Sequence, residues 1–228
     1  MDSIREFFLE HWYEFASIVV LGIATYFVEK RRARRVEQKA RELGFRYEKH
    51  KQLGDDIKKK DFRILKAVMH SAQNYMEKEI GGVLVSVFGC MYHKTEFLGS
   101  RVNFHWQTVA MFKFSESNFP RFHLRPETFF DSLKVHLYFD DIDFDSNRLF
   151  SSNHFLTGTN EKEIRRLFDE TKVDALADKH GITIEARDEY LLFYRDSRRP
   201  KVEMLDEFVK EASAVWNIFA ARALKLEQ

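Results

Sequence analysis

The sequence predicts an α+β protein in which an N-terminal transmembrane helix precedes a mainly antiparallel sheet with helices packed on one side. Three observations predict this fold class. An uncharged apolar run near the N-terminus stops at a block of cations. Two long strand-like segments occupy the middle of the chain, and amphipathic helical patterns dominate its last third.

The predicted membrane span covers residues 15–28 (FASIVVLGIATYFV), which carry no charge and are followed by seven Lys or Arg between Lys30 and Arg41. Each Lys or Arg would cost at least about 2.5 kcal/mol at the bilayer centre, so this block favours the membrane surface. The run is short, giving roughly 21 Å of helix against about 30 Å of hydrocarbon. A buried core helix is the alternative, but it would have no reason to end in cations. A secretory signal is disfavoured because the N-terminus is acidic and lacks a small-residue cleavage site.

The span belongs to a longer helix that we expect to run from about Ile4 to Leu43. Ser3 and Glu6 match a capping box at its start, and Gly44 suits a left-handed C-cap at its end. The sequence therefore predicts a membrane-anchor helix with a basic juxtamembrane extension in residues 1–44 and one cytoplasmic α+β domain in residues 45–228. Only Arg5 is basic before the span, so the positive-inside rule places the N-terminus outside the cell membrane.

Composition restricts the function classes. The chain has 37 basic and 36 acidic residues, and seven of the basic ones lie in the block beside the span, so the rest of the chain is mildly acidic and no nucleic-acid partner is expected. Cys90 is the only cysteine, which excludes an internal disulfide framework and fits a reducing cytoplasm. The 23 phenylalanines are interpreted as packing residues of the core rather than as a ligand surface.

The middle of the chain predicts a β-hairpin. Residues 82–95 are apolar at successive positions, as in a strand buried on both faces, whereas residues 101–114 alternate as in a half-buried strand. Residues 98–100 (LGS) supply the turn between them. Residues 122–126 continue the sheet up to Pro126, which precedes a short helix at residues 127–134.

The last third predicts strands at residues 149–157, 182–185 and 190–194, the last two joined by the polar turn ARDE. A helix capped by Asn160 and closed by Gly181 lies before the second of these strands. The final helix begins near Pro200 and presents apolar residues at helical spacing, which predicts that it docks on the sheet.

Three strings, LRPE (residues 124–127), IDFDS (142–146) and FSSNHFLTGTNEKEIRRLF (150–168), resemble a group of uncharacterised bacterial single-pass membrane-anchored hypothetical proteins. The resemblance extends over most of the chain and implies an N-terminal anchor with a cytoplasmic α+β domain. It implies no activity and gives no residue a catalytic role.

Two histidines of the hairpin form the first candidate metal site. If the turn centres on Gly99, His93 faces His105 across the two strands, and two such imidazoles can share a zinc ion. His123 or His136 would have to supply a further ligand. The alternative, two histidines on a polar or half-buried sheet face, is favoured because a single-residue shift of register separates them.

The acidic segment Asp140, Asp141, Asp143 and Asp145 is the second candidate, because alternating carboxylates can gather Ca²⁺ or Mg²⁺. It does not match an EF-hand, since Ser146 stands where glycine is needed, and a solvated acidic strand face is the favoured interpretation. The sequence has no glycine-rich phosphate loop, nucleophile elbow or HExxH motif. No catalytic, cofactor-binding or metal-ligating residue is therefore assigned, and no cofactor is expected.

The favoured function is a non-enzymatic, membrane-anchored cytoplasmic domain that binds or positions another protein. Residues 15–28 and the basic segment 30–41 are expected to contact membrane lipids, the latter through anionic headgroups. Two alternatives stay open: a membrane-bound, metal-dependent hydrolase-type enzyme that uses His93, His105 or the Asp140 to Asp145 segment, and a domain that binds a lipid or another apolar ligand.

Overall fold

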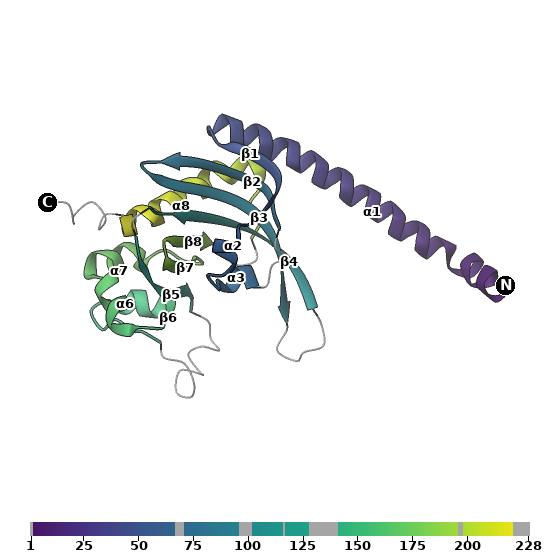
Figure 1. The fold of residues 1–228 in the computed structure, drawn as a ribbon. Coiled ribbons are helices and arrows are strands. Elements are labelled where there is room, and N and C mark those ends of the chain that lie inside the picture. Colours follow the sequence, from purple (N-terminus) through teal and green to yellow (C-terminus); the bar gives the residue numbers. More distant parts are fainter. Residues whose placement is uncertain are drawn as a thin grey trace.

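The computed structural model describes residues 2–66, 71–95, 102–115, 117–127, 141–195 and 198–220. Helix α1 (Asp2–Glu42) projects from the body of the molecule as a long rod (Figure 1). It ends as predicted at Gly44, whose φ is +74°, with the Gly44 and Phe45 amides bonded to the Arg41 and Ala40 carbonyls. By length and composition, α1 is a candidate membrane-spanning helix.

The eight strands of the described residues form one antiparallel sheet in the order β1-β2-β3-β4-β8-β7-β5-β6. Their bounds are β1 (Arg46–Gln52), β2 (Ser71–Ile80), β3 (Val83–Thr95), β4 (Val102–Lys113), β5 (Phe119–Pro126), β6 (His154–Gly158), β7 (Thr183–Asp188) and β8 (Tyr190–Tyr194). The α+β class with an antiparallel sheet is thus confirmed. Strands β1 and β2 come from a segment for which the sequence suggested no elements.

One face of the sheet is covered by helices α5 (Arg148–Asn153), α6 (Glu161–Leu167), α7 (Glu170–Ala177) and α8 (Leu205–Ala220), the last preceded by the 3₁₀ turn η1 (Val202–Met204). Phenylalanine rings fill this interface. Phe168 lies 5.0 Å from Phe122 and 5.6 Å from Phe219 between ring centroids. Most of the described phenylalanines are buried, and many of them pack on one another at this interface, as the composition predicted, whereas Phe27 and Phe104 are exposed.

The opposite face carries two one-turn helices, α2 (Asp55–Lys58) and α3 (Arg63–Lys66), which the sequence did not predict. Ile57 and Phe62 of this segment pack with Val109, Met111 and other side chains of β3, β4 and β8. Strand β4 is therefore buried on both faces over this stretch, and its prediction as a half-buried strand was wrong. The face of β4 that the alternation predicted to be polar is covered by the α2–α3 segment, which lies far from β4 in the sequence.

Three other predictions need correction or lie outside the described residues. Residues 148–153 form α5 rather than a strand, because the Asn147 side chain accepts a hydrogen bond from the Phe150 amide and caps a helix there. The helix predicted after Asn160 is two helices, since Asp169 caps α7. The predicted turn at residues 98–100 and the helix at residues 127–134 fall, apart from residue 127, on positions that are not described.

Candidate functional site

The exposed part of α1 carries apolar side chains with no cover. Ile18, Val20 and Leu21 are 66%, 65% and 69% exposed, which is the arrangement that a lipid environment requires. The same helix is docked on the domain further along, where Val36 packs with Val202 and Leu205. One continuous helix therefore joins an uncovered apolar segment to a packed domain.

Polar contacts fix the domain at the point where the apolar run ends. Arg199 donates two hydrogen bonds to the Glu29 carboxylate, at 2.8 and 2.7 Å, and its guanidinium lies 4.4 Å from the centre of the Trp106 ring. Arg32 donates to the Pro200 carbonyl at 2.8 Å. Such a bidentate pair also restricts the angle between its two segments.

The basic segment 30–41, which the sequence assigned to lipid contact, has side chains that contact the domain and side chains that are exposed. Arg32, Arg35 and Lys39 reach the domain, the latter two through Glu203 and Asp206 respectively. Arg31 and Arg34 stay exposed. Part of the charge block therefore holds the helix to the domain, and part of it is free to meet solvent or headgroups.

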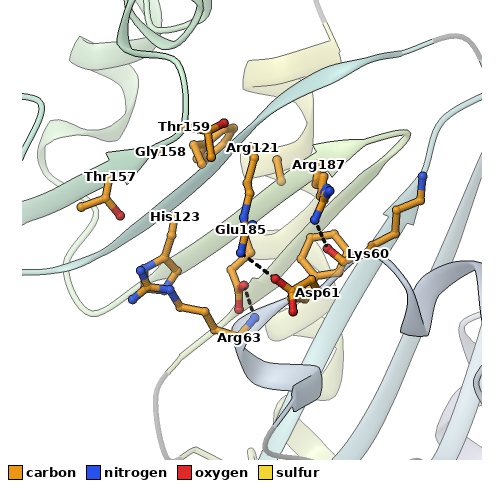
Figure 2. A pocket seen from close by; sticks show the side chains of 13 residues that line it. Lys60, Asp61, Arg63, Arg121, His123, Thr157, Gly158, Thr159, Glu185 and Arg187 are labelled. Atoms are coloured by element: carbon orange, nitrogen blue, oxygen red, sulfur yellow. Dashed lines mark hydrogen bonds and ion pairs between the residues drawn. The ribbon is translucent and has the colours of Figure 1, made fainter. Parts of the chain in front are cut away.

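A polar cleft with a volume of about 210 Å³ lies at the end of the sheet opposite β1 (Figure 2). It forms where the α2–α3 cover ends and the strands β7, β5 and β6 continue. Thr157, His123 and Glu185 stand side by side on these three strands, because His123 is paired with both of the others in the sheet register. Thirteen residues line the cleft, and they are Lys60, Asp61, Phe62, Arg63, Arg121, Phe122, His123, Thr157, Gly158, Thr159, Glu185, Ala186 and Arg187.

Glu185 is the buried acid of the cleft, only 4% exposed. Its carboxylate accepts hydrogen bonds from the Arg63 amide at 2.6 Å, the Ile64 amide at 3.1 Å and the Tyr194 hydroxyl at 2.8 Å. Burial raises the pKa of Glu185, while these hydrogen bonds act in the opposite direction. The residue fastens the start of α3 to the sheet.

His123 lies beside the guanidinium of Arg63 in Figure 2. Burial, together with the charges of Arg63 and Arg125, lowers the pKa of His123 to about 3, so the imidazole is neutral at physiological pH. Its Nδ1 atom is buried and has no hydrogen-bond partner. A buried polar atom without a partner is uncommon and costly, and it marks this ring as a group with unused bonding capacity.

Three arginines converge on the cleft from different elements. Arg121 of β5 donates to Asp61 at 2.9 Å, and Arg187 of β7 donates to the Lys60 carbonyl at 2.9 Å. Arg63, at the start of α3, is exposed, and within the part of the chain that the structure describes its guanidinium has no acidic side chain within 4 Å.

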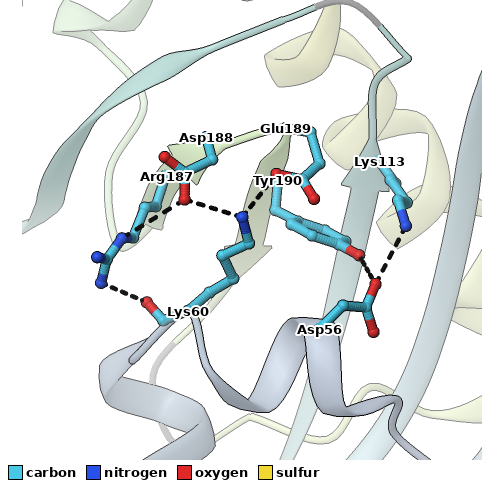
Figure 3. Close-up of polar contacts among 7 residues, drawn as sticks. All are labelled: Asp56, Lys60, Lys113, Arg187, Asp188, Glu189 and Tyr190. Carbon is cyan, nitrogen blue, oxygen red and sulfur yellow. Dashed lines mark hydrogen bonds and ion pairs between the residues drawn. The ribbon is translucent and has the colours of Figure 1, made fainter.

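The rim of the cleft is held in place by a charged network (Figure 3). Lys60 contacts Asp188 at 2.9 Å and Glu189 at 2.8 Å, in the turn between β7 and β8. These carboxylates raise the pKa of Lys60. At the other end of α2, Asp56 accepts from Lys113 at 3.1 Å and from the Tyr190 hydroxyl. The positive charge of Lys60 is thereby balanced by Asp188 and Glu189, which are not among the residues that line the cleft.

Comparison with solved structures finds the crystal structure of the mycobacterial trehalose monomycolate transport factor A, TtfA. The TM-score is 0.55 at 17% sequence identity, and the match covers 82% of this chain and 93% of that one. The likeness shows the fold. No protein-family model matches the sequence, and no curated protein matches it. The candidate membrane helix and the α+β fold agree with the architecture that the resemblance to membrane-anchored bacterial proteins implied.

The structure does not bring His93 and His105 together. His93 pairs with Phe104 and His105 with Tyr92, so the register differs by one residue from the one centred on Gly99. Because side chains alternate along a strand, the two histidines lie on opposite faces of the sheet and cannot share a metal. The predicted facing pair was wrong.

The acidic segment is not a strand. Asp141 lies in an irregular stretch, where its carboxylate accepts a hydrogen bond from the amide of Leu156 in the edge strand β6. Burial and the neighbouring Asp143 raise the pKa of Asp141 to about 6. Asp140 and His136 lie outside the described residues. Within the described ranges, no group of three or more potential ligands is placed to hold a metal ion.

The residues of the cleft were largely missed from the sequence. His123 was considered only as an extra metal ligand, and Arg63, Arg121, Arg187 and Glu185 were not singled out. One signal was available: Glu185 is a charged residue in the apolar strand segment ITIEA. The arginines give no such signal, because they come from three segments that meet only through the sheet order.

Proposed function

We propose that the chain is a single-pass membrane protein whose domain, residues 45–228, lies in the cytoplasm and binds or positions another protein without catalysing a reaction. The N-terminus lies outside, following the charge asymmetry around the span. The exposed Arg31 and Arg34 face anionic headgroups, at about 1 kcal/mol per cation.

The continuity of α1 supports this proposal more than any other observation. Its uncovered apolar segment ends within one turn of the Glu29–Arg199 pair, and the following turns pack on the domain. A domain joined in this way keeps a fixed orientation to the membrane instead of moving on a linker. Fixed orientation is useful for presenting a surface to a neighbouring membrane protein, which is the kind of partner that we propose.

The comparison supports a non-enzymatic role in general terms. TtfA is named as a transport factor, and an accessory role in a membrane process is compatible with this architecture. The hydrolase alternative has less support, because the register separates His93 from His105. The apolar-ligand alternative has less support because most of the described phenylalanines are buried in the core.

Anchoring and orientation are tested together. Replacing Leu21 and Ile23 by Arg should release the protein from membranes, because both cations would enter the hydrocarbon, whereas alanine at the same positions should not. Ser3→Cys should then react with an impermeant maleimide from outside the cell and Lys225→Cys should not. The native Cys90 should not react with the maleimide and can stay in both variants, because it is fully buried and burial raises the pKa of its thiol to about 12. The reverse labelling pattern would overturn the orientation.

The binding role is tested by cross-linking in intact cells, followed by capture from detergent-solubilised membranes. The full chain is compared with a matched chain in which residues 45–228 are replaced by an unrelated soluble domain. We expect a membrane protein that is recovered only with the native domain. Recovery by both chains would assign the contact to α1, and recovery by neither would remove the support for a binding role.

A further inference from the structure

We propose that the cleft between the α2–α3 segment and strands β5, β6 and β7 is a binding site for the phosphate group of a small soluble phosphate monoester. This inference is independent of the protein partner proposed above. It rests on the arrangement of donors, acids and neutral groups around a cavity that is lined entirely by described residues.

Hydrogen-bond donors exceed acceptors in the cleft. Each guanidinium carries five N–H donors in a rigid fork. Arg121 uses one on Asp61, and Arg187 uses one on the Lys60 carbonyl and forms an ion pair with Asp188 at 3.7 Å. Arg63 reaches no acid within the described part of the chain. Forks of this geometry match the paired oxygens of a phosphate, and charge-assisted hydrogen bonds are about twice as strong as neutral ones.

The two acids of the cleft do not compete for the ligand's place. Asp61 is bonded to Arg121, and Glu185 is occupied by two backbone amides and a tyrosine hydroxyl. Both lie against the protein and are held there by these bonds. Arg63 therefore provides unbalanced positive charge at the cavity, and Arg121 and Arg187 add N–H donors that their own partners do not use.

Neutral groups complete the site. Thr157 and Thr159 also line the cleft, and in the view of Figure 2 both lie above Arg63. The His123 ring also lines the cleft, and among the described residues its buried Nδ1 atom has no hydrogen-bond partner.

Size and position define the class of ligand. A volume of about 210 Å³ is below the ~300–1,000 Å³ of pockets for drug-sized molecules, so the cleft suits a phosphate with a few carbon atoms attached. Strands β7, β5 and β6 lie at the end of the sheet opposite β1, the strand beside which α1 packs. The cleft is thus remote from the membrane helix, which favours a soluble monoester over a lipid headgroup.

The test uses the full chain in uncharged detergent micelles and calorimetric titration with inorganic phosphate and with glycerol 3-phosphate. We expect saturable binding of both at one site per chain. Arg63→Gln should weaken this binding roughly tenfold or more, as expected for a lost charge-assisted hydrogen bond. Arg148→Gln is the matched control, because Arg148 is an exposed arginine of the same domain that lies outside the cleft. The Arg148→Gln variant should bind both ligands as tightly as the unmodified protein does.

Thermal unfolding provides a second measurement that does not depend on heat signals. Saturating glycerol 3-phosphate should raise the unfolding midpoint of the unmodified protein and of Arg148→Gln, but much less that of Arg63→Gln. The midpoints without ligand should be equal, since Arg63 is exposed.

Three results would overturn the proposal. Absence of saturable binding at ligand concentrations up to about 10 mM would remove the site, because a site with a Kd of about 1 mM would be about nine-tenths occupied at that concentration. Equal affinity in Arg63→Gln and the unmodified protein would place the phosphate elsewhere. Binding of dihexanoyl phosphatidic acid without any binding of glycerol 3-phosphate would show that the source is a lipid and not a soluble monoester.

Discussion

The two faces of the sheet differ in how they are covered and in the residues that they bury. One face lies under α5, α6, α7 and α8 and is filled by phenylalanines and aliphatic side chains. Among the described residues, the other face is covered by α2 and α3 over β3, β4 and β8. It holds most of the buried polar residues, and these include Glu77, Ser86, Gln107, Thr183 and Glu185. The first face supplies the stability of the domain, whereas the second has the groups that can recognise a ligand.

This difference has a physical origin in the covering elements. A helix such as α8 supplies an apolar stripe through five buried residues and needs no polar contact to the sheet. The one-turn helices α2 and α3 bury Ile57, Ile64 and Leu65, but they are too short to pair most of their own backbone groups. Glu185 and Asp56 satisfy such groups or bridge to strands, so polar side chains are required under this cover.

The largest effect is expected on the helix-covered face. Phe168→Ala should lower the free energy of unfolding by about 3 to 5 kcal/mol, because Phe168 is 1% exposed and contacts the rings of Phe122 and Phe219. Urea unfolding followed by tryptophan fluorescence measures the change. Leu149→Ala is the control, since Leu149 is 53% exposed and should change stability by less than about 0.5 kcal/mol. Equal effects of the two substitutions would contradict the assigned core.

A smaller effect is expected under α2 and α3. Phe62 is 3% exposed and meets the Tyr190 ring edge-on at 6.5 Å, so Phe62→Ala should remove comparable packing. A short segment can detach locally, however, which limits the loss of global stability to about 2 kcal/mol. Hydrogen exchange should accelerate in residues 53–65 and stay unchanged in α8. Acceleration throughout the domain would mean that this cover belongs to the main cooperative unit.

The sequence predicted the first face better than the second. Asn160, Gly44 and the apolar spacing of the last helix act locally, so they could be recognised without the fold. The second face depends on residues 53–66, whose one-turn helices have no periodicity to detect. The alternation of β4 correctly placed Ala110, Phe112 and Phe114 on one face, but it could not indicate that Gln107 is buried on the other.

The candidate site was harder to predict than the fold. Its arginines belong to α3, β5 and β7, and they approach one another only because β5 inserts between β7 and β6. The register of the hairpin, which decides whether His93 and His105 meet, depends on a turn of uncertain length in sequence. A shift of one residue reverses the answer.

Protonation of Glu185 should sharpen the contrast between the faces. The pKa of this carboxyl is raised above its ordinary value of 4.5, so the folded state binds more protons than the unfolded state. The contribution of this pKa shift to the free energy of unfolding is therefore fully present below pH 4.5, and it is lost as pH rises through the pKa of Glu185 in the folded state.

Glu185→Gln removes this dependence and loses one hydrogen bond, because the amide NH₂ cannot accept from a backbone N–H. We expect the variant to be about 1 to 3 kcal/mol less stable at pH 5. The deficit should shrink at pH 8, as measured by urea unfolding at both pH values. Thr183→Val, on the same strand and face, serves as a pH-independent comparison. A deficit that grows with pH would reverse the sign of the pKa shift.

The smallest effect is expected for the histidines of the β3–β4 hairpin, which occupy opposite faces. His105 is half-buried, and its ring lies 5.7 Å from that of Tyr92, whereas His93 is in register with Phe104 on the other side. A shared zinc ion needs both nitrogens about 2.0 to 2.1 Å from the metal, which this register excludes. We therefore expect the purified full chain to contain no stoichiometric metal by elemental analysis. His93→Gln combined with His105→Gln should change the free energy of unfolding by less than about 0.5 kcal/mol, as surface substitutions usually do. One zinc per chain that is lost in the double variant would require a hairpin register shifted by one residue, and such a shift would exchange the side chains of β4 between the two faces.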